Sequence, residues 1–84
     1  SVMQRFPQEL INVPVTDKHA VTDNAAVAKA IEAGNGELGD SGRILVRPSG
    51  TEPLVRVMVE APTHEQAHGV AAKIAQVIEA ELGA

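Results

Sequence analysis

The stretch RILVRPSGTEPLVRVMVEA, residues 43–61, decides the fold because it places two apolar runs on either side of a short polar loop. Residues 43–47 and 54–61 are rich in Val, Leu and Ile, which are enriched in strands. The six residues between the runs include Gly and two Pro, and an antiparallel hairpin is the simplest connection of this length. The sequence therefore predicts two neighbouring antiparallel strands.

The pairing of these strands decides where the arginines point. If Arg47 lies opposite Leu54, one face of the hairpin is wholly apolar, with Val46 facing Val55 and Ile44 facing Val57. The opposite face then holds Arg43, Leu45, Arg47, Leu54, Arg56 and Met58. On that face Arg47 and Arg56 are diagonal neighbours, about 7–8 Å apart at Cα. Their repulsion would be relieved by a bound anion, and guanidinium groups bind phosphate in a bidentate way.

The loop adds further groups that suit an anion. Ser49 and Thr51 supply hydroxyl donors, and Gly50 lets the backbone approach a ligand or adopt a positive φ. Consecutive N–H groups in such a turn can form an anion-binding nest, and the two prolines restrict the loop. These residue types leave two interpretations open: a phosphate site, or an ordinary polar loop with two solvated arginines.

N-terminal to the hairpin, a strand and a helix are predicted. Residues 8–15 form the strand, which Pro14 ends or confines to a sheet edge. A short strand within residues 16–21 remains open. Residues 22–33 form the helix, with Thr22 or Asp23 as its N-cap.

Two glycines make the end of that helix uncertain. Gly34 and Gly36 disfavour its continuation, although Leu38 keeps the apolar spacing.

Residues 62–84 predict a second, longer helix. Thr63 and Gln66 have the spacing of a capping box at its start. An apolar stripe with helical periodicity follows, which we expect to be buried: Ala67, Val70, Ala71, Ile74, Val77 and Ile78.

The order β-α-β-β-α predicts one α+β domain, residues 1–84, with a small antiparallel-type sheet and two helices on one face. Residues 1–6 are interpreted as the remnant of a preceding linker or helix. A formal charge of −4 argues against binding to nucleic acid or to an anionic membrane. The sequence has no cysteine and no apolar run of transmembrane length, so we expect a cytoplasmic protein.

The stretch RPSGTEPLVRVMVEA, residues 47–61, resembles the signature of the C-terminal domain of the α-D-phosphohexomutases. Residues 6–21 and 38–47 also follow that family's order of elements, so the resemblance covers nearly the whole chain. It is strongest to the bacterial branch that interconverts glucosamine 6-phosphate and glucosamine 1-phosphate. It implies the TATA-binding-protein-like fold of the family's fourth domain.

The resemblance also implies roles for individual residues. The full enzyme of the family has a phosphoserine on its first domain and magnesium on its third, and neither motif occurs in this sequence. The chain would then hold no catalytic residue and no metal ligand, and its partners would be the sugar phosphate and the remaining domains of its own chain. The family's contacts to the non-reacting phosphate match Arg47, Ser49, Gly50 and Thr51, with Arg56 in support. Two alternatives remain open: the same domain of a phosphomannomutase or phosphoglucomutase, and a stand-alone anion-binding interaction module.

Residues 64–68 spell His-Glu-Gln-Ala-His, the zinc metalloprotease pattern. The later acids, Glu79 and Glu81, lie farther along the same helix and cannot supply a third ligand. We therefore expect His64 and His68 to be solvated surface residues and His19 to be a loop residue.

Overall fold

The computed structural model describes residues 7–83, apart from the side chains of Lys18 and Asp40. Within this range β3 (Leu54–Glu60) lies between β1 (Gln8–Pro14) and β2 (Arg43–Pro48), and it pairs antiparallel with both. The sequence explains the central place of β3, because its alternate residues Val55, Val57 and Val59 have no exposed surface. The interpretation of residues 1–6 as a linker or helix remnant lies outside the described residues.

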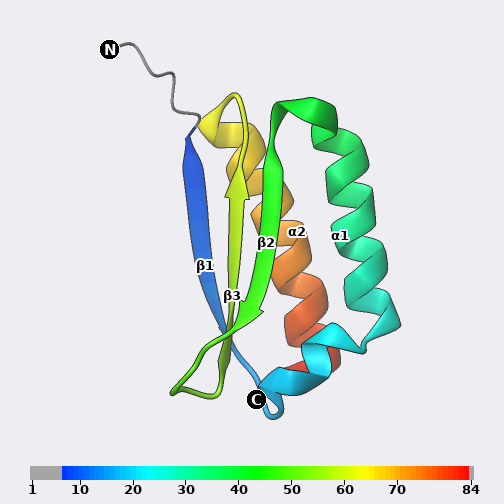
Figure 1. Cartoon of the computed structure of the whole chain (residues 1–84), viewed down its shortest axis with the longest axis vertical. Helices are drawn as coiled ribbons and strands as arrows, with labels where there is room; N and C mark the ends of the chain where they lie inside the picture. Colours follow the sequence, from blue (N-terminus) through cyan, green and yellow to red (C-terminus); the bar gives the residue numbers. More distant parts are fainter. Residues whose placement is uncertain (1–6, 84) are drawn as a thin grey trace.

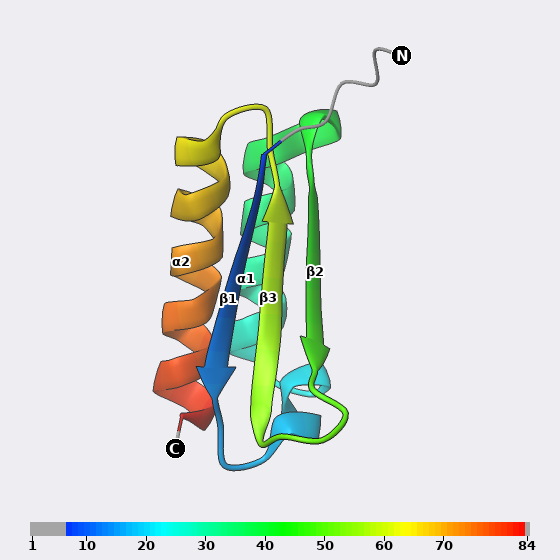
Figure 2. The ribbon, with the colours of Figure 1, turned by 90° about the vertical axis from the view of Figure 1, so that its left-hand side faces the viewer.

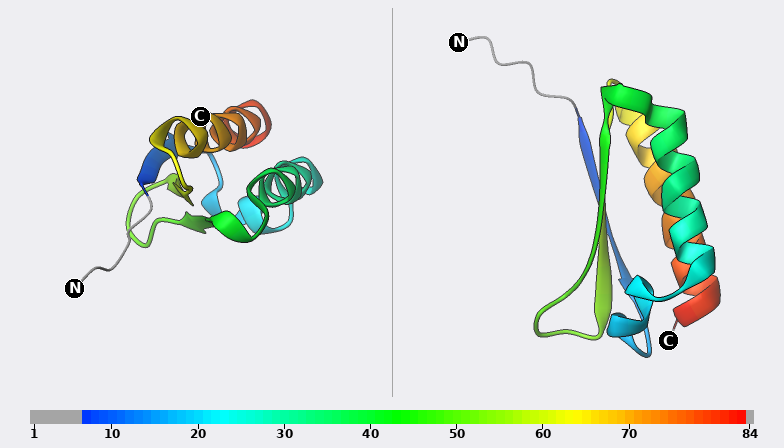
Figure 3. Two further views of the ribbon diagram at one scale, coloured as in Figure 1. Left: turned by 90° about the horizontal axis from the view of Figure 1, so that it is seen from above. Right: turned by 45° about the vertical axis from the view of Figure 1, so that its right-hand side comes forward.

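Two helices cover one face of this sheet and leave the other open (Figure 1, Figure 2). The first is α1 (Ala25–Leu38), which precedes β2, and the second is α2 (His64–Leu82), which follows β3. The view from the side in Figure 3 shows both helices on the same side of the sheet. The predicted α+β class and the β-α-β-β-α order are therefore confirmed.

The register between β2 and β3 differs by two residues from the expected one. Arg47 lies opposite Arg56 rather than Leu54, and Val46 lies opposite Val57. The strands remain paired closer to the loop than expected, since the Ser49 N–H donates to the Leu54 carbonyl at 2.8 Å. A shift of two residues leaves every side chain on its predicted face because side chains alternate along a strand. The two-faced hairpin is confirmed, and its predicted pairing was wrong.

The first helix begins later and ends later than the sequence indicated. Its N-cap is Asn24, whose Oδ1 accepts from the Val27 N–H at 3.1 Å, so neither Thr22 nor Asp23 has this role. The helix also continues through both glycines to Leu38.

Close packing explains why a glycine lies within α1. A Cβ at Gly34 would lie 2.7 Å from Ile44 Cδ1 and 2.9 Å from Val70 Cγ1, so α1 can lie this close to β2 and α2 only without a side chain there.

A 3₁₀ helix, Lys18–Thr22, connects β1 to α1. The sequence left undecided whether residues 16–21 form a fourth strand, and the structure has this 3₁₀ helix there instead. His19 lies within it and is exposed, and its N–H bonds to Asp17 Oδ1 at 3.1 Å.

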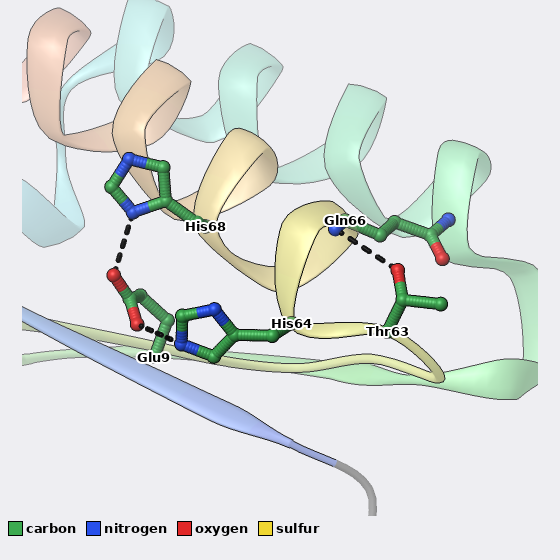
Figure 4. A network of polar contacts seen from close by, with 5 residues as sticks. All are labelled: Glu9, Thr63, His64, Gln66 and His68. Atoms are coloured by element: carbon green, nitrogen blue, oxygen red, sulfur yellow. Dashed lines mark hydrogen bonds and ion pairs between the residues drawn. The ribbon is translucent and has the colours of Figure 1, made fainter.

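The predicted buried stripe of α2 is confirmed. Thr63 Oγ1 accepts from the Gln66 N–H at 3.1 Å (Figure 4). The return bond from the Thr63 N–H to the Gln66 side chain is not found in residues 7–83, so only half of the capping box is formed. Val77 is half-buried, and the rest of the stripe is buried: Ala67, Val70, Ala71, Ile74 and Ile78. Neither helix of residues 7–83 is long and apolar enough to cross a membrane.

Candidate functional site

The open face of the sheet has a polar row that crosses all three strands. Asn12 of β1 lies opposite Arg56 of β3, which lies opposite Arg47 of β2. All three residues are exposed. The Cβ atoms of directly opposite residues are about 5 Å apart. Arg47 and Arg56 are therefore closer to each other than in the diagonal arrangement that the sequence predicted.

No described carboxylate lies within 4.0 Å of either guanidinium group, since the ion pairs found in residues 7–83 are those of Glu9 and Lys73. Two neighbouring cations without a described counter-ion form a local site that favours an anion.

The loop beyond this pair is held by its own hydrogen bonds. Ser49 is buried, and its Oγ accepts from the Glu52 N–H at 3.3 Å. The Val15 N–H donates to the Pro53 carbonyl at 3.0 Å, which ties the loop to the end of β1. Figure 3 shows the loop curving away from the helices, toward the open side of the sheet. The Ser49 side chain therefore holds the loop in shape and is not turned toward solvent.

Gly50 and Thr51 are the exposed tip of this loop. Gly50 does not have a positive φ, so that part of the expectation is wrong. A Cβ at Gly50 would meet nothing within 4 Å, and the fold therefore gives no steric reason for glycine there. Close approach of a ligand to the backbone, the other reason given for Gly50, is consistent with this open space.

The pairing of a carboxylate with the two histidines was missed by sequence reasoning. Glu9 of β1 lies between the two histidines of α2, with its Oε1 3.1 Å from His64 Nε2 and its Oε2 2.6 Å from His68 Nδ1 (Figure 4). The hydrogen bond from His68, together with the charges of both histidines, lowers the pKa of Glu9 below its ordinary value of 4.5, against an opposing effect of burial.

The two histidines are exposed, as expected, but they are paired with Glu9 instead of being only solvated. The signal was available, because Glu9 precedes Ile11 and Val13 on the helix-facing alternation of the first strand. In the described residues, no cluster of three or more His, Asp or Glu is arranged to hold a metal ion.

Comparison with known proteins assigns the fold and the loop to a family. The family model described as "Phosphoglucomutase/phosphomannomutase, C-terminal domain" matches residues 10–77. The chain belongs to this family.

Relatives with high sequence identity are named phosphoglucosamine mutase. The chain is 58% identical over 82 residues to that protein from Bacillus licheniformis, 57% over 81 residues to the one from Staphylococcus carnosus, and 55% over 83 residues to the one from Streptomyces coelicolor. These matches cover 96–99% of this phosphohexomutase domain but 18% of each relative. The chain thus spans about one fifth of the length of these relatives.

Solved structures confirm the fold of the domain. Aspergillus fumigatus N-acetylphosphoglucosamine mutase superposes with a TM-score of 0.81 at 23% identity, over 94% of this chain and 16% of that protein. The same fungal enzyme in complex with GlcNAc-6P and magnesium gives a TM-score of 0.73 at 24% identity, over 87% of this chain. At this identity the likeness shows the shared fold and nothing further.

Proposed function

We propose that this chain is the C-terminal, substrate-phosphate-binding domain of a phosphoglucosamine mutase, which interconverts glucosamine 6-phosphate and glucosamine 1-phosphate. The 55–58% identity to proteins of that name supports the enzyme. The directly opposed pair Arg47 and Arg56 at the base of the loop supports the phosphate role, and it is the single observation on which that role depends.

Each residue of the predicted site has a distinct part in binding. The guanidinium groups of Arg47 and Arg56 approach a phosphate from neighbouring strands and donate charge-assisted hydrogen bonds to its oxygens. Thr51 adds a hydroxyl donor, and Gly50 leaves the backbone open to close contact. Ser49 contributes indirectly, because its buried hydroxyl bonds to the Glu52 N–H and fixes the loop.

The domain contributes binding energy and no chemistry of its own. A mutase has to hold its sugar in two opposite orientations, and the distal phosphate is present in both. Contacts to that phosphate supply remote binding energy that positions the reacting end. The nucleophile and the magnesium ion belong, in this proposal, to other domains of the full-length protein, and the isolated chain is inactive.

The matching family model also names phosphoglucomutase and phosphomannomutase, and the same phosphate site would serve those sugars. Sugar preference is then a property of the other domains.

An amide chemical-shift titration of the isolated chain with glucosamine 6-phosphate tests this proposal. We expect shifts at residues 47–52 and weaker ones at Arg56, with a Kd on the order of millimolar or weaker, because an exposed half-site is screened by solvent. Arg47→Ala should abolish these shifts. Arg43→Ala is the matched control, since Arg43 lies on the same strand and face but opposite Glu60, and its Kd should stay within about twofold. Shifts scattered over α1 and α2, or equal effects of the two substitutions, would contradict the proposal.

A further inference from the structure

Asn12 of β1 is a polar residue that the strand itself does not explain. Asparagine is depleted in strands, and Asn12 lies exposed between Ile11 and the buried Val13. Its direct partner across the sheet is Arg56. The other described residues next to it on the open face, along β1 and diagonally on β3, are apolar: Leu10, Pro14, Leu54 and Met58. By the strand register, Arg56 is therefore the nearest polar side chain to the Asn12 amide on this face.

The polar rows at the two ends of the open face differ in charge. The row far from the loop contains an amide, an acid and an arginine: Gln8, Glu60 and Arg43. The row next to the loop contains an amide and two arginines: Asn12, Arg56 and Arg47. An aspartate in place of Asn12 would stabilise this row, because opposite charges on facing strands attract. It would also compete with an anion for Arg56, so the neutral amide favours anion binding over stability.

The shape of a guanidinium group explains what an amide beside Arg56 can do. The planar fork carries N–H donors on more than one edge, and a bidentate contact with phosphate uses one of them. Arg56 has Arg47 on one side and Asn12 on the other. The edge toward Arg47 suits a phosphate shared by both arginines, whereas the edge toward β1 needs a different acceptor. The carbonyl of an asparagine side chain accepts such a bond and brings no charge.

We propose that Asn12 is a positioning residue of the phosphate site, whose side-chain carbonyl accepts from the Arg56 guanidinium when phosphate is bound and holds it beside Arg47. The inference rests on the proposed function and deepens it. In residues 7–83 neither the Asn12 amide nor the Arg56 guanidinium has a hydrogen-bond partner, so both are available for this contact. Since the amide is neutral, both arginines keep their full positive charge for the anion.

Two substitutions at position 12 test this role in the isolated chain, with inorganic phosphate as the probe at fixed ionic strength. Asn12→Ala should raise the Kd for phosphate by about three- to tenfold, because a hydrogen bond to a charged group is lost. Asn12→Asp should raise it by at least about tenfold, since the new carboxylate pairs with Arg56 and repels the anion. The same carboxylate should raise the Tm measured without phosphate, because it faces an arginine across the strands.

Gln8→Glu is the matched control. It makes the same change of charge on the same strand and face, at an exposed position that lies about 13 Å along the strand from Asn12. Its Kd for phosphate should stay within about twofold of the native value, since charges at this distance are screened.

Opposite changes in affinity and stability distinguish positioning from a structural role. A structural role alone would lower the Tm of whichever variant binds phosphate less tightly. A native Kd in Asn12→Ala, a Kd in Asn12→Asp equal to that of Gln8→Glu, or a weakened affinity in Asn12→Asp together with a lowered Tm would each overturn the inference.

A failure of the phosphate role itself is observed in other samples. If the native chain shows no shifts at residues 47–52, or if its shifts survive Arg47→Ala, the proposed function fails and the role of Asn12 fails with it. If the native chain and Arg47→Ala behave as proposed while the variants at position 12 bind like the native chain, the role of Asn12 alone is wrong.

Discussion

Removing one guanidinium from the Arg47–Arg56 pair should stabilise the domain when no phosphate is present. Like charges directly opposite on antiparallel strands are destabilising, by about 0.2–1 kcal/mol. Both side chains are exposed, and no described carboxylate lies within 4.0 Å to offset the repulsion. We expect Arg47→Gln to raise the free energy of unfolding by about 0.5 kcal/mol, which raises the Tm of a domain of this size by about 2–4 °C.

Arg43→Gln is the control, and the strand register predicts that it changes the free energy of unfolding in the opposite direction. Arg43 lies on the same strand and face as Arg47, but its partner across the sheet is Glu60. No ion pair within 4.0 Å joins Arg43 to Glu60, so removing this guanidinium takes away only a weak, solvent-screened attraction. The free energy of unfolding should fall by about 0.2–0.5 kcal/mol. Both effects should shrink at 1 M salt, where the Debye length is about 3 Å.

Thermal unfolding followed by circular dichroism measures both changes, provided that the buffer contains neither phosphate nor sulfate. Adding phosphate at ten times its Kd, at matched ionic strength, should stabilise the native protein by about 1.4 kcal/mol. The Arg47→Gln variant should gain much less stability from phosphate. Its Tm should therefore lie above that of the native protein without phosphate and below it with phosphate. Changes of the same sign in Arg47→Gln and Arg43→Gln, or a Tm order that phosphate leaves unaltered, would refute the reasoning.

Two further predictions concern the fold. Gly34→Ala should lower the free energy of unfolding by about 1–3 kcal/mol, because the new Cβ would lie 2.7 Å from Ile44 Cδ1. Gly36→Ala on the same helix is the control: its Cβ would meet nothing within 4 Å, so the substitution should raise the free energy of unfolding by up to about 1 kcal/mol. Urea unfolding measures both changes. Glu9 has a lowered pKa in the folded state, so its charge contributes stability above its ordinary value of 4.5 that is lost as the pH falls through the folded value. In acid titrations the difference in the free energy of unfolding between the native chain and Glu9→Gln should therefore be present near neutral pH and disappear below the folded pKa of Glu9. A difference that stays constant at all pH values would contradict a stabilising role of the Glu9 charge.

Much of this architecture could be predicted because the patterns were strong and local. The alternation in β3 and the apolar stripe of α2 fixed which residues face the core, and both are confirmed. The hairpin register could not be fixed in this way, because shifts by two residues give the same faces. The Ser49 N–H bond to Leu54 distinguishes between these registers, and it depends on the folded loop.

The errors in the helical region have a different origin. Gly34 disfavours a helix by its intrinsic propensity, and this cost is overridden by the close contact of α1 with Ile44 and Val70. The pairing of Glu9 with His68 joins residues 59 positions apart, so the alternation of the first strand could place Glu9 on the helix-facing side but could not identify its partner. Both cases depend on tertiary contacts between elements that the sequence places far apart.

The loop and its flanking strands contain two kinds of residue, and the distinction bears on function. Ser49 is one that the fold itself explains, because its buried side chain and backbone each make a bond that shapes the loop. Gly50 and the Arg47–Arg56 pair are of the other kind, because the fold does not explain them. The fold would accommodate a side chain at Gly50, and the two positive charges that face each other across the strands weaken it. Local sequence choices that conflict with stability concentrate at functional sites. The proposed phosphate between the guanidinium groups would remove the repulsion and use the open backbone, so one ligand would account for both departures.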